Sequence, residues 1–346
     1  MERRRVYTLA CGQIVKHPFA QPAIVREKMK HAGRRSFIKK GLLGAAGLAS
    51  SPTASAAIAA KDADHGTTPR CKLGMVTYEL GKSWDIATLI ANCTVAGFEA
   101  VELRTTHRHG VEISLPKEQR LEVKKRFAES PVRLLSLGTM CAYHYADRAM
   151  VDQNIEETKR WCELAHDLGC LGVKVRPNGF VKDVPEEKTL AQIGNSLERC
   201  GDAARDNGVE IWVEVHGQRT EEPSNMLRIM ELAGSPLVGI CWNSSDTDVA
   251  NGSVMQAFDM LKPWLRNCHI NELWRTPSPW GTKLGRPQEE SNKGFPSYSR
   301  PYPYREFFQL LRAAGYDRYT LAEVPESTEP VRFMRYYRAL WEQLAG

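Results

Sequence analysis

The chain has 346 residues, of which 42% are hydrophobic and 25% are charged, the composition of an ordinary globular protein. Its formal net charge of +6 at pH 7 comes from the first 56 residues, which hold 11 basic and 2 acidic side chains. The remainder carries 36 basic against 39 acidic side chains, so it is mildly acidic and has no electrostatic basis for binding a nucleic acid.

Residues 1–60 are predicted to be a leader with a twin-arginine signal peptide. Arg34 and Arg35 are followed by Ser-Phe-Ile-Lys-Lys and then by an uncharged stretch rich in Ala and Gly. That stretch has too few large apolar side chains for a membrane span, and residues 54–56 are small enough for a signal peptidase. We expect an exported, periplasmic or extracytoplasmic protein without stable membrane insertion after cleavage, and a polar linker over residues 61–70.

Beyond residue 70, short β-type runs alternate with amphipathic helical runs. The eight predicted strands are residues 72–78, 100–104, 132–137, 171–176, 209–216, 237–242, 266–270 and 319–324. Helical segments such as 154–168, 186–207 and 304–314 separate them, and several end on glycine, which is typical of helix C-termini. Strict alternation implies parallel strands with right-handed crossovers.

Eight such units predict one domain over residues 71–346, a (β/α)8 TIM barrel of the α/β class. No Gly-x-Gly-x-x-Gly motif follows the first strand, which counts against a dinucleotide-binding fold. Residues 275–303 interrupt the pattern after the seventh strand, where they are either a lid over the barrel mouth or an insertion without that role.

Polar side chains gather late in most of the predicted strands. Since alternate residues of a barrel strand point inward, pairs two residues apart share the interior face. These inward residues are Glu102 and Arg104, Lys174 and Arg176, Glu214 and His216, Asn243, His269 and Asn271, and Glu323. Catalytic groups of such barrels lie at strand C-termini, and each inward charge must be compensated, so the pattern favours an active site over a structural ion network.

Four of these segments resemble the xylose isomerase-like barrels, the sugar phosphate isomerase/epimerase superfamily. They read VEVHG at 213–217, VGICWN at 238–243, CHINE at 268–272 and LAEV at 321–324. The resemblance runs from about residue 71 to the C-terminus and implies one bound Mn, Mg, Co or Zn ion. The ligands that it implies are Glu214, Asn243, His269 and Glu323.

Asn243 departs from the family pattern, which has aspartate there. An amide oxygen still binds hard cations, but the ligand set then carries two negative charges rather than three, so we expect weaker affinity. Asp246 or Asp248 compensates if the following loop curls inward; the alternative is a weak or absent metal.

The resemblance also implies isomerase or epimerase chemistry on a sugar or keto-sugar. Glu214 and Glu323 would exchange a proton across an enediolate while the ion stabilises the oxyanion. Six residues are assigned to the carbohydrate substrate: Glu102, His107, Lys174, Arg176, His216 and Arg275. Two alternatives stay open, a 3-keto-glycoside lyase or hydratase on the same metal site and a non-catalytic sugar-binding barrel, and an oligomer is not excluded.

Replacing Arg34 and Arg35 together by lysine is expected to retain the protein in the cytoplasm, because the twin-arginine route reads that pair. Cell fractionation measures the outcome. Unchanged delivery across the membrane, with cleavage near Ala56, would remove the twin-arginine interpretation.

Overall fold

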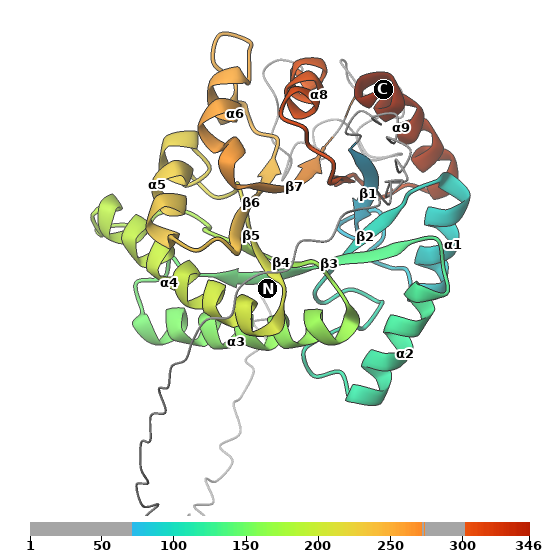
Figure 1. Cartoon of the computed structure of the whole chain (residues 1–346), viewed down its shortest axis with the longest axis horizontal. Coiled ribbons are helices and arrows are strands. Elements are labelled where there is room, and N and C mark those ends of the chain that lie inside the picture. Colours follow the sequence, from blue (N-terminus) through green and yellow to red (C-terminus); the bar gives the residue numbers. More distant parts are fainter. Residues whose placement is uncertain (1–70, 272, 274–301) are drawn as a thin grey trace, which may run out of the picture. The chain divides into compact units, whose positions relative to one another are not determined.

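The computed structural model describes residues 71–271, 273 and 302–346, and their strands close into a barrel (Figure 1). Every neighbouring pair of strands is parallel, and β1 pairs with β8 to complete the ring. The strands are β1 (Lys72–Val76), β2 (Ala100–Arg104), β3 (Arg133–Ala142), β4 (Gly172–Arg176), β5 (Glu210–Glu214), β6 (Val238–Asn243), β7 (Leu265–Ile270) and β8 (Tyr319–Ala322). The predicted (β/α)8 TIM barrel is confirmed.

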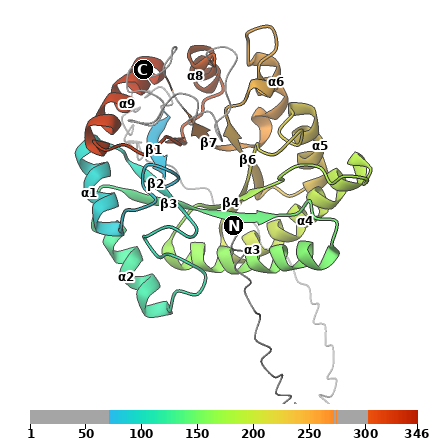
Figure 2. The same cartoon turned by 180° about the vertical axis from the view of Figure 1, so that it is seen from behind.

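Helices surround the barrel on the outside, as the views from both sides show (Figures 1 and 2). They are α1 (Ile86–Ala96), α2 (Lys117–Ala128), α3 (Arg148–Leu168), α4 (Glu186–Asn207), α5 (Pro223–Ala233), α6 (Met255–Leu261), α8 (Tyr304–Ala313) and α9 (Pro330–Ala345). Among the described residues, no helix is both long and apolar enough to cross a membrane.

The helix ends follow local sequence signals. Three helices stop at Gly97, Gly169 and Gly208, which adopt the left-handed conformation that glycine tolerates best. Helix α3 begins six residues before the predicted position because the side chain of Asp147 accepts a hydrogen bond from the backbone N–H of Ala149.

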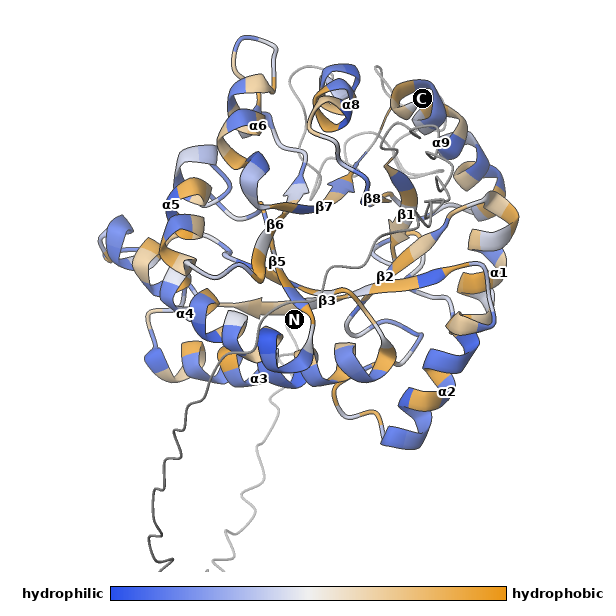
Figure 3. Cartoon of the chain, in the orientation of Figure 1, coloured by the Kyte–Doolittle hydropathy of each residue, from blue (hydrophilic) through white to orange (hydrophobic). Residues whose placement is uncertain are grey.

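Two apolar layers stabilise the barrel. The larger lies between strands and helices, and the strands are accordingly apolar over most of their length (Figure 3). The smaller fills the barrel interior below the mouth and consists of Val76, Ala100, Leu135, Trp212, Cys241 and Leu321. Trp212 fits because position 172 is glycine: a Cβ atom there would lie 2.4 Å from the indole ring. This layer closes the floor beneath the polar strand ends.

A buried hydrogen-bonded chain fixes the loop after β6. Asp248, in the short 3-10 helix η1 (Asp246–Asp248), accepts hydrogen bonds from the backbone N–H of Ser245 and the hydroxyl of Tyr302, both at 2.9 Å. Trp242 Nε1 donates to the same hydroxyl at 3.0 Å. Burial raises the pKa of Asp248 from 3.8 to about 7, because the charged form has lost its hydration.

Asp248→Asn is expected to stabilise the fold above neutral pH. The folded protein holds the Asp248 proton more tightly than the unfolded chain, so wild-type stability falls as pH rises from about 4 through 7. Asparagine keeps an acceptor oxygen and never ionises, and its advantage should grow over that window to on the order of 1–4 kcal/mol at pH 8.

Urea unfolding at pH 5 and pH 8 measures this difference, and Asp246→Asn, on the exposed side of the same turn, is the control. An advantage of Asp248→Asn that does not change with pH would contradict a buried, protonated carboxyl group.

Candidate active site

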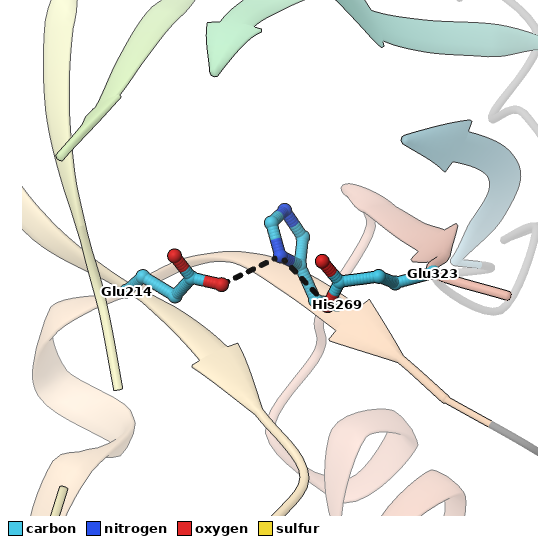
Figure 4. A group of neighbouring side chains, drawn as sticks. All are labelled: Glu214, His269 and Glu323. Atoms are coloured by element: carbon cyan, nitrogen blue, oxygen red, sulfur yellow. Dashed lines mark ion pairs between the residues drawn. The ribbon is translucent and has the colours of Figure 1, made fainter. Parts of the chain in front are cut away.

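Three potential metal ligands converge at the C-terminal mouth of the barrel (Figure 4). Glu214 ends β5, His269 lies near the end of β7, and Glu323 directly follows β8. His269 Nδ1 lies 3.3 Å from Glu214 Oε1 and 3.6 Å from Glu323 Oε2. Strands β5 and β7 lie on either side of β6, and β8 lies next to β7. The closed parallel sheet thus brings together residues that are more than fifty positions apart in the sequence.

A buried ion pair holds Glu214. Lys174 Nζ, from β4, donates to Glu214 Oε2 at 2.7 Å, and each side chain is only 5% exposed. Burial alone would raise the pKa of Glu214, but the ammonium keeps it well below its usual range. Burial likewise opposes the charged form of Lys174, whose pKa is nevertheless raised by Glu214 and Glu102. Both groups are therefore charged, and Glu214 Oε1 is left to face His269.

Glu102 lies beneath the histidine. Its Oε1 is 3.3 Å from His269 Nε2, and its Oε2 accepts a hydrogen bond from the Ser136 hydroxyl at 2.8 Å. Burial would lower the pKa of His269, but Cys241 and Glu102 raise it well above its usual range. A carboxylate behind the second ring nitrogen orients a ligating imidazole and leaves the first nitrogen free for an ion.

Asn243, at the end of β6, faces the same group. Its Nδ2 lies 3.5 Å from Glu214 Oε1, whereas its Oδ1 is buried without a hydrogen-bond partner among the described residues. Asp246 and Asp248 do not compensate for the missing aspartate: among the described residues, neither belongs to the group of Glu214, His269 and Glu323, and neither lines the cavity that these groups face.

This donor set fits a divalent cation. Ligand atoms of Glu214, His269 and Glu323 all lie within 4.8 Å of one another. His269 Nδ1 and Asn243 Oδ1 are buried atoms that lack hydrogen-bond partners in the described part of the chain. Two carboxylates, an imidazole and an amide oxygen would satisfy Mn, Mg, Co or Zn with different preferences, so the geometry does not select one metal.

A cavity of about 240 Å³ opens above these groups. Lys174, Arg176 and His216, three of the residues predicted to bind substrate, line it. Several other residues line the cavity without having been predicted to bind substrate: Tyr78, Glu221, Ser244, Ser245, and the inward-facing Arg104 and Asn271. Tyr78, Arg104 and Asn271 each lie two residues beyond an inward-facing side chain, and this spacing could have predicted that they face the cavity.

Two predicted substrate residues do not line this cavity. Glu102 is fully buried behind His269, which suits orientation of that ring rather than substrate contact. His107 lies behind the mouth, with Nδ1 3.2 Å from Thr77 Oγ1 and Nε2 3.4 Å from Arg104 Nη1. A third, Arg275, lies outside the described residues, as does most of the predicted 275–303 loop.

The histidine at the cavity wall is neutral near pH 7. Burial lowers the pKa of His216, Glu214 opposes this, and Arg176 and Lys174 lower it further. A neutral imidazole both donates and accepts hydrogen bonds, so His216 suits a sugar hydroxyl.

Residues 90–340 match the family model described as xylose isomerase-like TIM barrel. The chain belongs to this family. The predicted family resemblance is thereby confirmed. No curated protein matches the chain by sequence.

Several solved structures share this xylose isomerase-like barrel. The 3-keto-D-glucoside 4-epimerase YcjR from E. coli has a TM-score of 0.62 at 14% identity, over 79% of this chain and 100% of its own. A D-psicose 3-epimerase, studied with D-fructose, has a TM-score of 0.61 at 15% identity, over 80% and 99%. The IolI protein with a bound zinc atom has a TM-score of 0.60 at 16% identity, over 79% and 96%. At these identities the likeness shows a common fold alone.

Proposed function

We propose that this protein is a divalent-metal-dependent isomerase or epimerase that moves a proton beside the carbonyl group of a sugar or keto-sugar. The observation that carries the proposal is the convergence of Glu214, His269 and Glu323 at the mouth of a barrel of this family. Structural neighbours that are named as sugar epimerases support it. Export by the twin-arginine route stays a prediction, which would favour free sugars or glycosides over sugar phosphates.

The protein's own groups divide the work of such a reaction. A bound divalent ion would supply Lewis acidity beside the carbonyl oxygen, stabilising the charge of an enediolate. His269 and Asn243 offer a ring nitrogen and an amide oxygen as ligand atoms, and Glu102 would keep the His269 ring in one orientation. The apolar floor around Trp212 keeps the site closed from below, which limits the water that competes for the proton.

The two glutamates are suited to proton transfer on opposite sides of a substrate, but their settings differ. Glu214 is fixed by Lys174, whereas the 16% exposed side chain of Glu323 lines the cavity and has no ammonium partner in the part of the chain that the structure describes. We infer that Glu323 is the more mobile base and that Glu214 exchanges its proton within the ion pair.

His269→Ala is expected to abolish binding of Mn²⁺ or Zn²⁺, because it removes the only nitrogen in the proposed ligand set. Asn243→Asp should bind the same ion more tightly, since it restores a third negative charge. Metal content after purification without chelators and the thermal shift on adding MnCl2 measure both effects. Wild-type protein that carries no ion and shows no shift with Mn²⁺ would contradict the metal site.

Proton transfer is tested by deuterium uptake. Wild type in D2O, supplied with ketoses such as D-fructose and D-psicose and with 3-keto-glycosides, should label the carbon beside the carbonyl. Glu214→Gln and Glu323→Gln should each slow labelling about 10²–10⁴-fold, the usual contribution of a general acid or base. Rates are normalised per bound metal because both residues are proposed ligands.

Product analysis in the same reactions separates the alternatives. An isomeric sugar supports epimerisation or isomerisation, and an eliminated or hydrated product indicates the lyase or hydratase alternative. Tight sugar binding without label and without product would indicate a non-catalytic binding barrel.

A further inference from the structure

One arginine in the cavity has no partner among the described residues. Arg176 ends β4 and lines the cavity, yet it forms no ion pair or side-chain hydrogen bond with any described residue. Its Nε atom is buried and lacks an acceptor. A guanidinium group always carries its charge and presents a planar fork of donors, so an unpaired one beside a cavity is suited to a planar anion.

The groups around Arg176 do not neutralise it. His144 and His216 are imidazoles, which bring no negative charge to a guanidinium group, and His216 lines the same cavity. The Nδ1 atoms of both rings are buried and lack hydrogen-bond partners among the described side chains. Glu214, on the adjacent strand β5, is already bound by Lys174. Among the described residues, Arg176 thus has no carboxylate partner.

The net charge of the site also favours an anionic ligand. Within the described residues, the cavity lining has three cations, Arg104, Lys174 and Arg176, and three carboxylates, Glu214, Glu221 and Glu323. Glu102 adds one more carboxylate beneath His269. With a divalent cation bound, the site would carry one excess positive charge, which a monoanionic ligand balances.

Arg176 lies across the mouth from Glu323. In the ring of eight strands, β4 and β8 are separated by three strands on either side. A ligand that reaches from Glu323 to Arg176 therefore spans the cavity. One end would lie at the reacting carbon and the other end at the guanidinium group.

We propose that the substrate is a sugar acid whose carboxylate is bound by Arg176. This proposal rests on the proposed function for the identity of the reacting end. The single carboxylate charge matches the one excess positive charge, whereas a phosphate ester would add close to two negative charges. His216, which lines the same cavity, is placed to hydrogen-bond an adjacent hydroxyl.

Matched pairs of sugars test the proposal by binding, without turnover. Calorimetry on the Mn²⁺-loaded full-length protein compares D-glucuronate with D-glucose, D-galacturonate with D-galactose, and 2-keto-D-gluconate and 5-keto-D-gluconate with D-fructose. D-Glucose 6-phosphate is the phosphate probe. At least one carboxylate sugar should bind about tenfold or more tightly than its neutral partner, with a preference that weakens as salt is raised.

Variants of Arg176 then locate the preference. Arg176→Gln should bring the carboxylate sugar to the affinity of its neutral partner while leaving Mn²⁺ content unchanged. Arg176→Lys keeps the charge without the fork and should retain part of the preference, and Arg160→Gln, exposed on α3, should behave as wild type.

Several outcomes would overturn the proposal: equal affinity within every pair, a preference that survives in Arg176→Gln, tighter binding of the phosphate ester, or no binding of any carboxylate sugar at millimolar concentration. Failure of the proposed function gives a different result. In that case carboxylate sugars bind through Arg176, but none exchanges deuterium. Conversely, deuterium exchange on a neutral ketose without any carboxylate preference would retain the function and reject the sugar acid.

Discussion

The ion pair between Lys174 and Glu214 is the interaction on which the polar layer of the barrel depends. A lone buried carboxylate costs several kcal/mol of folding free energy, so Glu214 is tolerated at this depth because an ammonium contacts it at 2.7 Å. Because Lys174 contacts one carboxylate oxygen of Glu214, the other oxygen faces His269. His269 in turn lies between Glu214 and Glu102, and Glu102 is held by Ser136. Each charged group therefore has its position set by the next.

The parallel barrel makes this arrangement possible because the inward face of its strands carries both the apolar floor and the polar residues above it. Trp212 and Glu214 are two residues apart on β5, and Leu321 and Glu323 stand in the same relation at β8. Side chains below the polar layer exclude water and lower the local dielectric response, which strengthens the ion pair above them. Moving the register of β5 by one residue would expose Trp212 to the helices and remove Glu214 from the mouth, so fold and site are specified together.

Most of the fold could be predicted from the sequence, because alternation of short apolar runs with amphipathic helices and glycine stops is a local signal. Glu214, Asn243, His269 and Glu323 could be placed at one end of the barrel for the same reason, although their ligand roles came from family resemblance and stay a prediction. The alternation of inward and outward residues along a strand also places Glu102 inside the barrel. How deep it lies depends on how the strands are packed against one another, and the structure puts it behind His269. Glu221 comes from the loop after β5, where no strand or helix periodicity predicts which way a side chain points. His107 is predicted to bind substrate, yet its ring contacts Thr77 and Arg104 and does not line the cavity.

Asparagine at position 243 has a physical consequence besides the weaker metal affinity that the sequence predicts. Its Nδ2 lies 3.5 Å from Glu214 Oε1, on the side of the carboxylate that Lys174 does not contact. An aspartate there would place a second negative charge beside Glu214, and without an ion the two would repel each other in a medium of low dielectric constant. The amide instead allows the carboxylate to stay ordered before metal arrives. It also removes the charge that would otherwise have cancelled the excess of the loaded site. If an ion is bound as proposed, asparagine at this position leaves the excess positive charge that the proposed sugar acid would balance, with Arg176 as the group that would bind its carboxylate.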